Sequence, residues 1–311
     1  MGKIAFVFPG QGSQTVGMGQ AIANSNSTAQ EVFNTADKRL GYDLSSIMFN
    51  GPQEKLTKTY YAQPALLTAS IALAQVLREA GIEPDYTAGH SLGEYSALVA
   101  SGALSFSDAV YAVSKRGELM EEAVPNGEGT MAAVLGLERN ILADITESVT
   151  KDGFPVQLAN LNCPGQIVIS GTVAGVEKAG ALAKESGAKR VLPLQVSGPF
   201  HSSLMKPAAE KFQSVLHEIE INEARIPVIA NVTAEPISDI EDTLVKQLYS
   251  PVLWEDSVEK MIELGVDTFI EVGPGKVLSG LIRKINRDVK TYSVQDPDSC
   301  QSVIDTLKGV K

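Results

Sequence analysis

The segment Tyr86-Thr87-Ala88-Gly89-His90-Ser91-Leu92-Gly93 decides the fold of this chain. A short strand-like run, residues 86–89, precedes the motif, and a helical pattern follows it as far as Gly102. The chain also opens with an apolar run, residues 3–8, which breaks at Pro9-Gly10-Gln11-Gly12. Apolar runs that end in glycine-rich loops are typical of buried parallel strands. Strands that alternate with helices in this way predict an α/β fold with a mostly parallel sheet.

The middle of the chain has a different pattern, which predicts a second and smaller domain. Its segments follow in the order β-α-β-β-α-β, the split unit of ferredoxin-like domains. The predicted strands are residues 130–135, 156–159, 166–170 and 190–196, and the predicted helices are residues 140–150 and 173–185. We therefore expect a large α/β domain, residues 1–127 and 198–311, with a ferredoxin-like small domain, residues 128–197, inserted into it.

The composition of the 311 residues excludes several classes of protein. There are 26 basic and 37 acidic side chains, a formal net charge of −11, so nucleic acid is not an expected partner. No stretch approaches the roughly 18 apolar residues of a membrane span, so no membrane partner is expected either. The two cysteines, Cys163 and Cys300, are too few for a disulfide scaffold or a structural zinc site. These features predict a cytoplasmic protein with two reduced thiols and no metal.

The motif Gly89-His90-Ser91-Leu92-Gly93 fits the G-x-S-x-G pattern of a nucleophile elbow, and it stands between a predicted strand and a predicted helix. In that context the Ser91 hydroxyl projects from the edge of the sheet. The backbone N–H of Leu92, at the start of the helix, can then face a developing oxyanion. The alternative is that Ser91 only caps the helix.

A nucleophilic serine needs a base, and the chain has only three histidines. His90 is the neighbour of Ser91, and adjacent side chains point apart. His217 lies in a helix with polar neighbours and is expected at the surface. His201 follows Ser197-Gly198-Pro199-Phe200, a loop that enters a helix, where an imidazole can be presented to a cleft. Since an imidazole titrates near neutral pH, His201 is the favoured general base.

The first glycine-rich loop does not bind a dinucleotide by the usual fingerprint. The pattern G-x-G-x-x-G needs glycine at position 15, where the residue is Thr15. A phosphate-binding P-loop is also absent, because Gly275-Lys276 is followed by Val277. Two alternatives remain for residues 9–15: the loop supplies a second oxyanion donor, or it is only a tight turn.

Seven motifs together resemble one family, the malonyl-CoA:acyl carrier protein transacylases of bacterial type II fatty acid synthesis. The resemblance covers essentially the whole chain. It implies an α/β-hydrolase-like parallel-sheet large domain with an inserted ferredoxin-like small domain. The motifs are residues 8–14, 63–65, 89–94, 115–117, 162–166, 198–201 and 271–276.

The resemblance implies a role for each matching site residue. Ser91 is similar to the acyl-accepting nucleophile of the family, and His201 to its general base and acid. The backbone N–H groups of Gln11 and Leu92 correspond to the oxyanion donors. The backbone carbonyl of Gln247 corresponds to the group that orients the histidine.

Arg116 matches the residue that holds the free carboxylate of the malonyl group, for which a planar guanidinium is well suited. Without the resemblance, the favoured interpretation of Arg116 is a solvated charge on a helix. Phe200 stands where methylmalonyl-selecting relatives tend to carry serine, so we expect malonyl selectivity. Pro199, next to this selectivity position, departs from the small residue that is commoner in the family.

The resemblance also implies the reaction: transfer of malonyl from malonyl-CoA to the phosphopantetheine thiol of acyl carrier protein. The CoA thioester is a substrate, and no cofactor is expected. A CoA-thioester hydrolase and a non-catalytic scaffold that binds the carrier protein are the alternatives. A basic patch is a candidate docking surface for an acidic carrier protein, and a merely solvated helix face is the other explanation. The patch comprises Lys276, Arg283, Lys284, Arg287 and Lys290, with Lys189 and Arg190 as further candidates.

Overall fold

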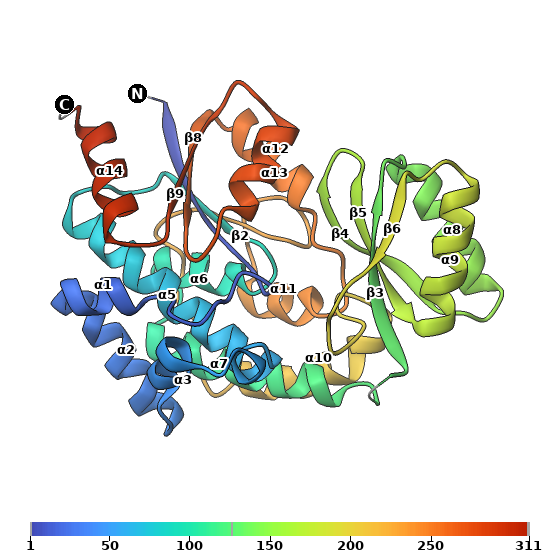
Figure 1. Ribbon diagram of the computed structural model, residues 1–311, viewed down its shortest axis with the longest axis horizontal. Coiled ribbons are helices and arrows are strands. Elements are labelled where there is room, and N and C mark those ends of the chain that lie inside the picture. The colour runs from blue at the N-terminus through green and yellow to red at the C-terminus, as the bar shows by residue number, and fades with distance from the viewer. Residues whose placement is uncertain (1, 126, 310–311) are drawn as a thin grey trace.

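The computed structural model describes residues 2–125 and 127–309, and two sheets organise them (Figure 1). Within these residues the larger sheet has five parallel strands in the order β7-β2-β1-β8-β9. The predicted α/β fold class with a parallel sheet is confirmed. The strands are β1 Lys3–Phe8, β2 Tyr86–Gly89, β7 Val228–Ile229, β8 Val266–Val272 and β9 Lys290–Val294.

Strand β1 lies in the middle of the larger sheet and is buried on both faces. Because side chains alternate along a strand, Ala5 and Val7 pack on one face against helices α12 (Trp254–Glu263) and α13 (Val277–Ile285). Phe6 and Phe8 pack on the other face with α5 (Thr59–Glu79), α6 (Gly93–Ala100) and their neighbours. Burial on both faces explains why the strand is a continuous apolar run rather than an alternating one.

Helices cover both faces of this sheet and lie in chain order between its strands (Figure 1). The amino-terminal half contains α1 Gln20–Ser25, α2 Ser27–Leu40, α3 Leu44–Asn50, α4 Gln53–Leu56, α5 Thr59–Glu79, α6 Gly93–Ala100 and α7 Phe106–Glu122. The carboxyl-terminal half contains a 3₁₀ turn, Ser203–Met205, and then α10 Lys206–Leu216, α11 Ile240–Gln247, α12 Trp254–Glu263, α13 Val277–Ile285 and α14 Pro297–Lys308.

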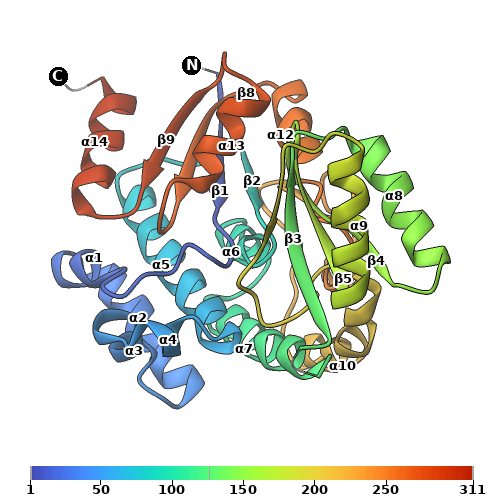
Figure 2. The ribbon, with the colours of Figure 1, turned by 45° about the vertical axis from the view of Figure 1, so that its right-hand side comes forward.

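The second sheet is antiparallel and has the strand order β4-β5-β3-β6. Its elements follow the predicted order β-α-β-β-α-β, and the sheet order is the one that ferredoxin-like domains have. Helices α8 and α9 cover the face of this sheet that is turned away from the larger sheet (Figures 1 and 2). The elements are β3 Gly129–Leu135, α8 Arg139–Lys151, β4 Val156–Cys163, β5 Gln166–Thr172, α9 Val173–Glu185 and β6 Arg190–Pro193.

Strand β4 ties the small sheet to the larger part of the molecule. The Leu161 N–H donates to the Val252 carbonyl at 2.9 Å, and the Val252 N–H donates to the Ala159 carbonyl at 2.8 Å. All strands of the small sheet come from the segment predicted as the small domain. The exact boundaries, residues 128–197 within 1–127 and 198–311, stay a prediction.

Two composition-based expectations can be compared with the structure. Cys163 and Cys300 are both buried and free. Across residues 2–125 and 127–309, every helix is too short or too polar to cross a membrane.

Candidate active site

The elbow at Ser91 joins β2 to α6 in a conformation that only close packing can hold. The backbone of Ser91 has a φ of 53°, in the left-handed region that residues other than glycine rarely adopt. A Cβ on Gly89 would overlap the Gly93 backbone, and a Cβ on Gly93 would overlap the Phe8 carbonyl of β1. Neither glycine of the motif leaves room for a side chain, because the start of α6 lies directly against the ends of β1 and β2.

Asn231, just after β7, clamps the elbow. Its Oδ1 accepts a hydrogen bond from the Ser91 backbone N–H at 2.7 Å, and its Nδ2 donates to the Gly89 carbonyl at 2.6 Å. The Ser91 N–H is thus occupied, while the hydroxyl is left to face the cavity. That hydroxyl bonds His201 and does not cap α6. No sequence pattern marked Asn231, because its partners lie about 140 positions away in the chain.

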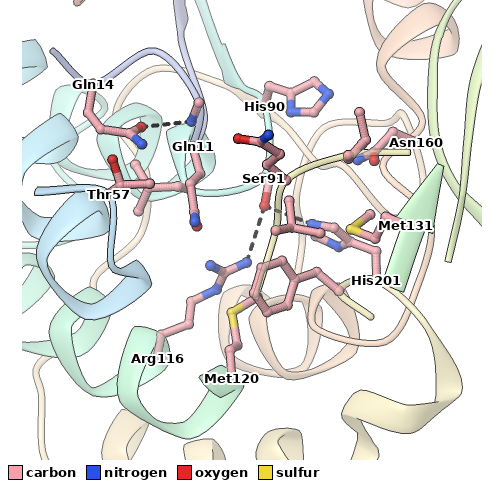
Figure 3. A pocket seen from close by; sticks show the side chains of 16 residues that line it. Gln11, Gln14, Thr57, His90, Ser91, Arg116, Met120, Met131, Asn160 and His201 are labelled. Atoms are coloured by element: carbon pink, nitrogen blue, oxygen red, sulfur yellow. Dashed lines mark hydrogen bonds between the residues drawn. The ribbon is translucent and has the colours of Figure 1, made fainter. Parts of the chain in front are cut away.

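Ser91 and His201 form a hydrogen-bonded pair (Figure 3). Ser91 Oγ lies 2.7 Å from His201 Nε2. On the other side of the ring, His201 Nδ1 lies 2.8 Å from the Gln247 carbonyl, which can only accept, so Nδ1 carries the proton. The Nε2 lone pair is then directed at the serine hydroxyl. This is the geometry that a general base needs.

Burial keeps the His201 imidazole neutral. The ring is buried, and this burial, followed by the nearby Arg116 charge, lowers the pKa of His201 from 6.5 to about 3. His201 is therefore in its proton-accepting form at neutral pH. The other two histidines lie elsewhere: His90 Nε2 is 2.8 Å from Asn162 Oδ1, and the exposed His217 is 2.7 Å from Glu241.

Arg116 is a fully buried cation with neutral hydrogen-bond partners. From α7 its Nη1 donates to Gln63 Oε1 at 2.8 Å, and its Nη2 donates to Gln247 Oε1 at 2.9 Å. The same Nη2 is 3.3 Å from Ser91 Oγ. Within the described part of the chain no carboxylate forms an ion pair with Arg116, although an isolated buried charge is costly. The geometry therefore favours an anionic ligand beside the serine.

A cavity of about 160 Å³ opens beside these residues, and its walls include the loops after β1 and β2 and residues of the small sheet. Ser91, His201 and Arg116 all line it, and the Ser91 hydroxyl contacts both of the other side chains (Figure 3). Met131 of β3 and Asn160 of β4 come from the small sheet. The cavity therefore lies between the two parts of the fold, at the carboxyl end of β2, where α/β sheets usually bind ligands.

The first glycine-rich loop lies directly against the elbow. A Cβ on Gly10 would come within 2.5 Å of the His90 carbonyl oxygen. Gln11 and Leu92 both line the cavity, and among the described residues neither backbone N–H has an acceptor. The loop is thus near enough to face the same ligand as Leu92, although the oxyanion role of both residues stays a prediction.

The apolar wall of the cavity includes Phe200, the residue expected to affect selectivity. Pro199 does not line the cavity. Its ring packs against Gly129 of β3, so closely that a Cβ on Gly129 would lie only 2.4 Å from Pro199 Cγ. Its departure from the family pattern therefore touches β3 packing rather than the cavity wall. Among residues 2–125 and 127–309, no group of three or more His, Cys, Asp or Glu side chains is arranged to hold a metal ion.

Comparisons with known proteins give one consistent result. The acyl transferase domain family matches residues 5–305. The malonyl CoA-acyl carrier protein transacylase of Bacillus subtilis is 60% identical over 311 residues, covering 99% of this chain and 98% of the relative. The Staphylococcus aureus transacylase is 52% identical over 298 residues, covering 95% of this chain and 96% of the relative.

Solved structures agree with these relatives. The acyl carrier protein S-malonyltransferase of Vibrio cholerae superposes with a TM-score of 0.94 at 47% identity, covering 97% of this chain and 99% of that chain. A malonyl-transacylase in complex with its type II PKS acyl-carrier protein has a TM-score of 0.94 at 44% identity, covering 98% and 99% of the two chains.

Proposed function

Because the chain belongs to the malonyl CoA-acyl carrier protein transacylases, a family of acyltransferases, we propose that it transfers malonyl from malonyl-CoA to the phosphopantetheine thiol of acyl carrier protein. One observation carries the proposal. The Ser91 hydroxyl bonds the neutral His201 imidazole and also lies 3.3 Å from the buried Arg116 guanidinium. A nucleophile beside a buried cation suits an acyl group that ends in a carboxylate.

In the first half of the reaction, Ser91 Oγ attacks the thioester carbonyl carbon and its proton moves to His201 Nε2. The oxyanion of the tetrahedral intermediate is held by the backbone N–H groups of Gln11 and Leu92. The loss of one such donor typically costs on the order of 3 kcal/mol of transition-state stabilisation. The intermediate collapses, the C–S bond breaks, and CoA leaves as a thiol with the proton from His201. Malonyl-Ser91 remains.

In the second half, the phosphopantetheine thiol of acyl carrier protein gives its proton to His201 and attacks the malonyl-Ser91 ester. The ester C–O bond breaks and Ser91 recovers the proton from His201. The Gln247 carbonyl keeps the imidazole oriented in both halves. Base, oxyanion donors and carboxylate partner all come from the chain, so the proposed ping-pong cycle uses no cofactor. Malonyl-CoA and the carrier protein are the two substrates.

Intact-mass measurement after mixing with malonyl-CoA tests the proposal. We expect the mass to rise by one malonyl group, and the added mass to disappear when holo acyl carrier protein is supplied. Ser91→Ala should form no adduct. A covalent malonyl adduct on Ser91→Ala would refute the assigned nucleophile.

The same experiment separates the two alternative functions. A CoA-thioester hydrolase would release free malonate without acyl carrier protein and would hold little adduct. A scaffold without catalytic activity would take no covalent label at all. A stable adduct that only the carrier protein discharges supports the transferase.

We place the reaction in fatty acid biosynthesis in the cytoplasm. Cys163 at the end of β4 and Cys300 in α14 are both buried and unpaired, which suits a reducing compartment. Separation of a cell lysate into cytosolic and membrane fractions tests the location. Recovery of the activity in the membrane fraction would contradict it.

A further inference from the structure

A carboxyl group is buried directly behind the active-site residues, and no step of the proposed reaction uses it. Glu94, in the first turn of α6, is wholly buried and does not line the cavity. Its Oε2 accepts hydrogen bonds from Gln247 Nε2 at 2.6 Å and from the Asn231 backbone N–H at 3.3 Å. Its Oε1 has no partner among the described residues. A buried carboxylate that is only half satisfied is costly, so its position needs a reason.

The reason lies in Gln247, which forms hydrogen bonds to Ser91, His201 and Arg116. Its backbone carbonyl orients His201, and its Oε1 accepts from Arg116 Nη2 at 2.9 Å. Its Nε2 donates to the Ser91 carbonyl at 3.0 Å and to Glu94. A side-chain amide can turn over and exchange its oxygen and nitrogen. Here Glu94 Oε2, which also accepts from the Asn231 backbone N–H, requires the nitrogen on its own side and leaves the oxygen for Arg116.

We propose that Glu94 is a positioning residue: through the Gln247 amide it holds the Arg116 guanidinium where the carboxylate of the acyl group meets it. The inference rests on the proposed function and deepens it, because it assigns part of the selectivity for a charged acyl group to a residue that never touches the substrate. If Glu94 is removed, the Gln247 amide is free to turn its NH₂ toward the guanidinium. Two donors then face each other, and Arg116 shifts from its place beside Ser91.

A purely structural role makes a different prediction. Glu94 also accepts from the Asn231 backbone, and Asn231 clamps the elbow. If the loss of Glu94 acts through Asn231, it displaces Ser91 itself and lowers the acylation rate equally for every acyl donor. If the loss of Glu94 acts through Gln247 and Arg116, it slows malonyl transfer more than acetyl transfer, because the acetyl group has no carboxylate.

The test compares acylation of Ser91 by malonyl-CoA and by acetyl-CoA in Glu94→Ala and Glu94→Gln. We expect Glu94→Ala to lower the malonyl-to-acetyl ratio of kcat/KM by at least about tenfold, the usual scale for a hydrogen bond to a charged group. Glu94→Gln keeps an acceptor oxygen for Gln247 Nε2, so it should keep the ratio within about threefold of the wild type. An unchanged ratio in Glu94→Ala, or an equal fall for both donors, would overturn the proposal.

A double-mutant cycle identifies the route. Gln247→Leu removes the side-chain amide but leaves the backbone carbonyl that His201 uses. Adding Glu94→Ala to Gln247→Leu should not lower the ratio further. A second, independent fall would show that Glu94 does not act through Gln247.

A matched control and the wild type complete the experiment. Glu271 is also a wholly buried carboxylate, which accepts from the Leu278 and Ser279 backbone N–H groups of α13, away from the cavity. Glu271→Gln should leave the malonyl-to-acetyl ratio unchanged. If the wild type forms no malonyl adduct, the proposed function fails. If the adduct forms and Glu94→Ala keeps the wild-type ratio, only the positioning role fails.

Discussion

Arg116 is the residue whose surroundings most restrict the substrate. Its guanidinium is buried among Gln63, Gln247 and Ser91, none of which carries a charge. We expect Arg116→Ala to lower kcat/KM for malonyl-CoA by about a hundredfold, the upper range for a hydrogen bond to a charged group, and to affect acetyl-CoA much less. Arg116→Lys should recover little, because one ammonium cannot replace a planar, bidentate donor. Rate measurements with both donors check this, and an unchanged malonyl-to-acetyl preference would contradict the role of Arg116.

Glu94 should make the stability of the protein depend on pH. Burial raises the pKa of its carboxyl from 4.5 to about 7. The unfolded chain loses this proton near pH 4.5 and the folded protein near pH 7, so the stabilising contribution is complete below pH 4.5 and is lost as the pH rises through 7. The shift corresponds to about 3 kcal/mol of unfolding free energy.

The amide of Glu94→Gln does not titrate, so this variant should not lose stability as the pH rises through 7. The melting temperature of the variant relative to the wild type should therefore be higher at pH 8 than at pH 5. Thermal unfolding at the two pH values measures the difference. An equal offset at both would show that the buried carboxyl is not the source of the pH dependence.

At the scale of elements, α6 can follow β2 so closely only because Gly93 has no side chain. A Cβ there would overlap the Phe8 carbonyl of β1. Gly93→Ala should destabilise the protein by about 1–3 kcal/mol or more, the usual cost of overpacking, and should displace Ser91. Gly280 is a matched control in α13, since a Cβ at Gly280 meets nothing within 4 Å.

Gly280→Ala should be neutral or stabilise the protein by about 0.5–1 kcal/mol, because alanine is the better helix former. Melting curves and acylation rates of the two variants test the contrast. A Gly93→Ala protein with wild-type stability and rate would show that the elbow can relax by moving β1.

Patterns in the sequence predict elements well where a single periodicity dominates. The helix expected at residues 173–185 is α9, with the same bounds. Strand β4 was expected to stop at residue 159 but runs to Cys163. The extra residues include Asn160 and Asn162, and asparagine is uncommon in strands. They are buried in the strand because Asn160 lines the cavity and Asn162 bonds His90. Strand β6 ends at Pro193 rather than at residue 196, and residues 194–196 line the cavity instead.

In the candidate site, too, some residues could be predicted from the sequence and others could not. Ser91 and His201 could be predicted, because a motif marks the first and a glycine- and proline-rich loop presents the second. Gln63 and Asn231 received no predicted role, and neither did Glu94. Each acts by a hydrogen bond to a residue far away in the sequence, as when Gln63 meets Arg116, 53 positions further on. Only the packing of α5 against α7 and of β7 beside β2 creates those contacts.

For the whole molecule, a net charge of −11 makes the placement of the basic residues important. Five basic residues are exposed on α13 and at its two ends: Lys276, Arg283, Lys284, Arg287 and Lys290. Lys284 Nζ donates to Gln166 Oε1 at 3.1 Å, which links this helix to the small sheet. In that sheet Gln166 and Arg190 both pair with Leu135, from opposite sides. Arg190 is therefore only two strand spacings, about 10 Å, from Gln166.

This basic patch, Lys276 to Lys290 with Lys189 and Arg190, is connected to the active site through the small sheet. Gln166 begins β5, and Asn162, near the end of the neighbouring strand β4, is the partner of His90 on the cavity wall. We therefore predict that a surface combining α13 and this end of the small sheet binds an acidic carrier protein close to Ser91. Electrostatic attraction of this kind acts mainly on association and weakens as salt screens it.

Reversal of charge at Arg283→Glu and Arg287→Glu tests the patch. We expect the KM for acyl carrier protein to rise by about tenfold at low salt and its salt dependence to flatten. Formation of malonyl-Ser91 from malonyl-CoA should not change, since neither side chain lines the cavity. The matched control is Lys38→Glu with Lys308→Glu, two exposed lysines on α2 and α14 that give the same net charge. An equal rise of KM in patch and control variants would assign the effect to total charge, and an unchanged KM in the patch variant would reject the surface.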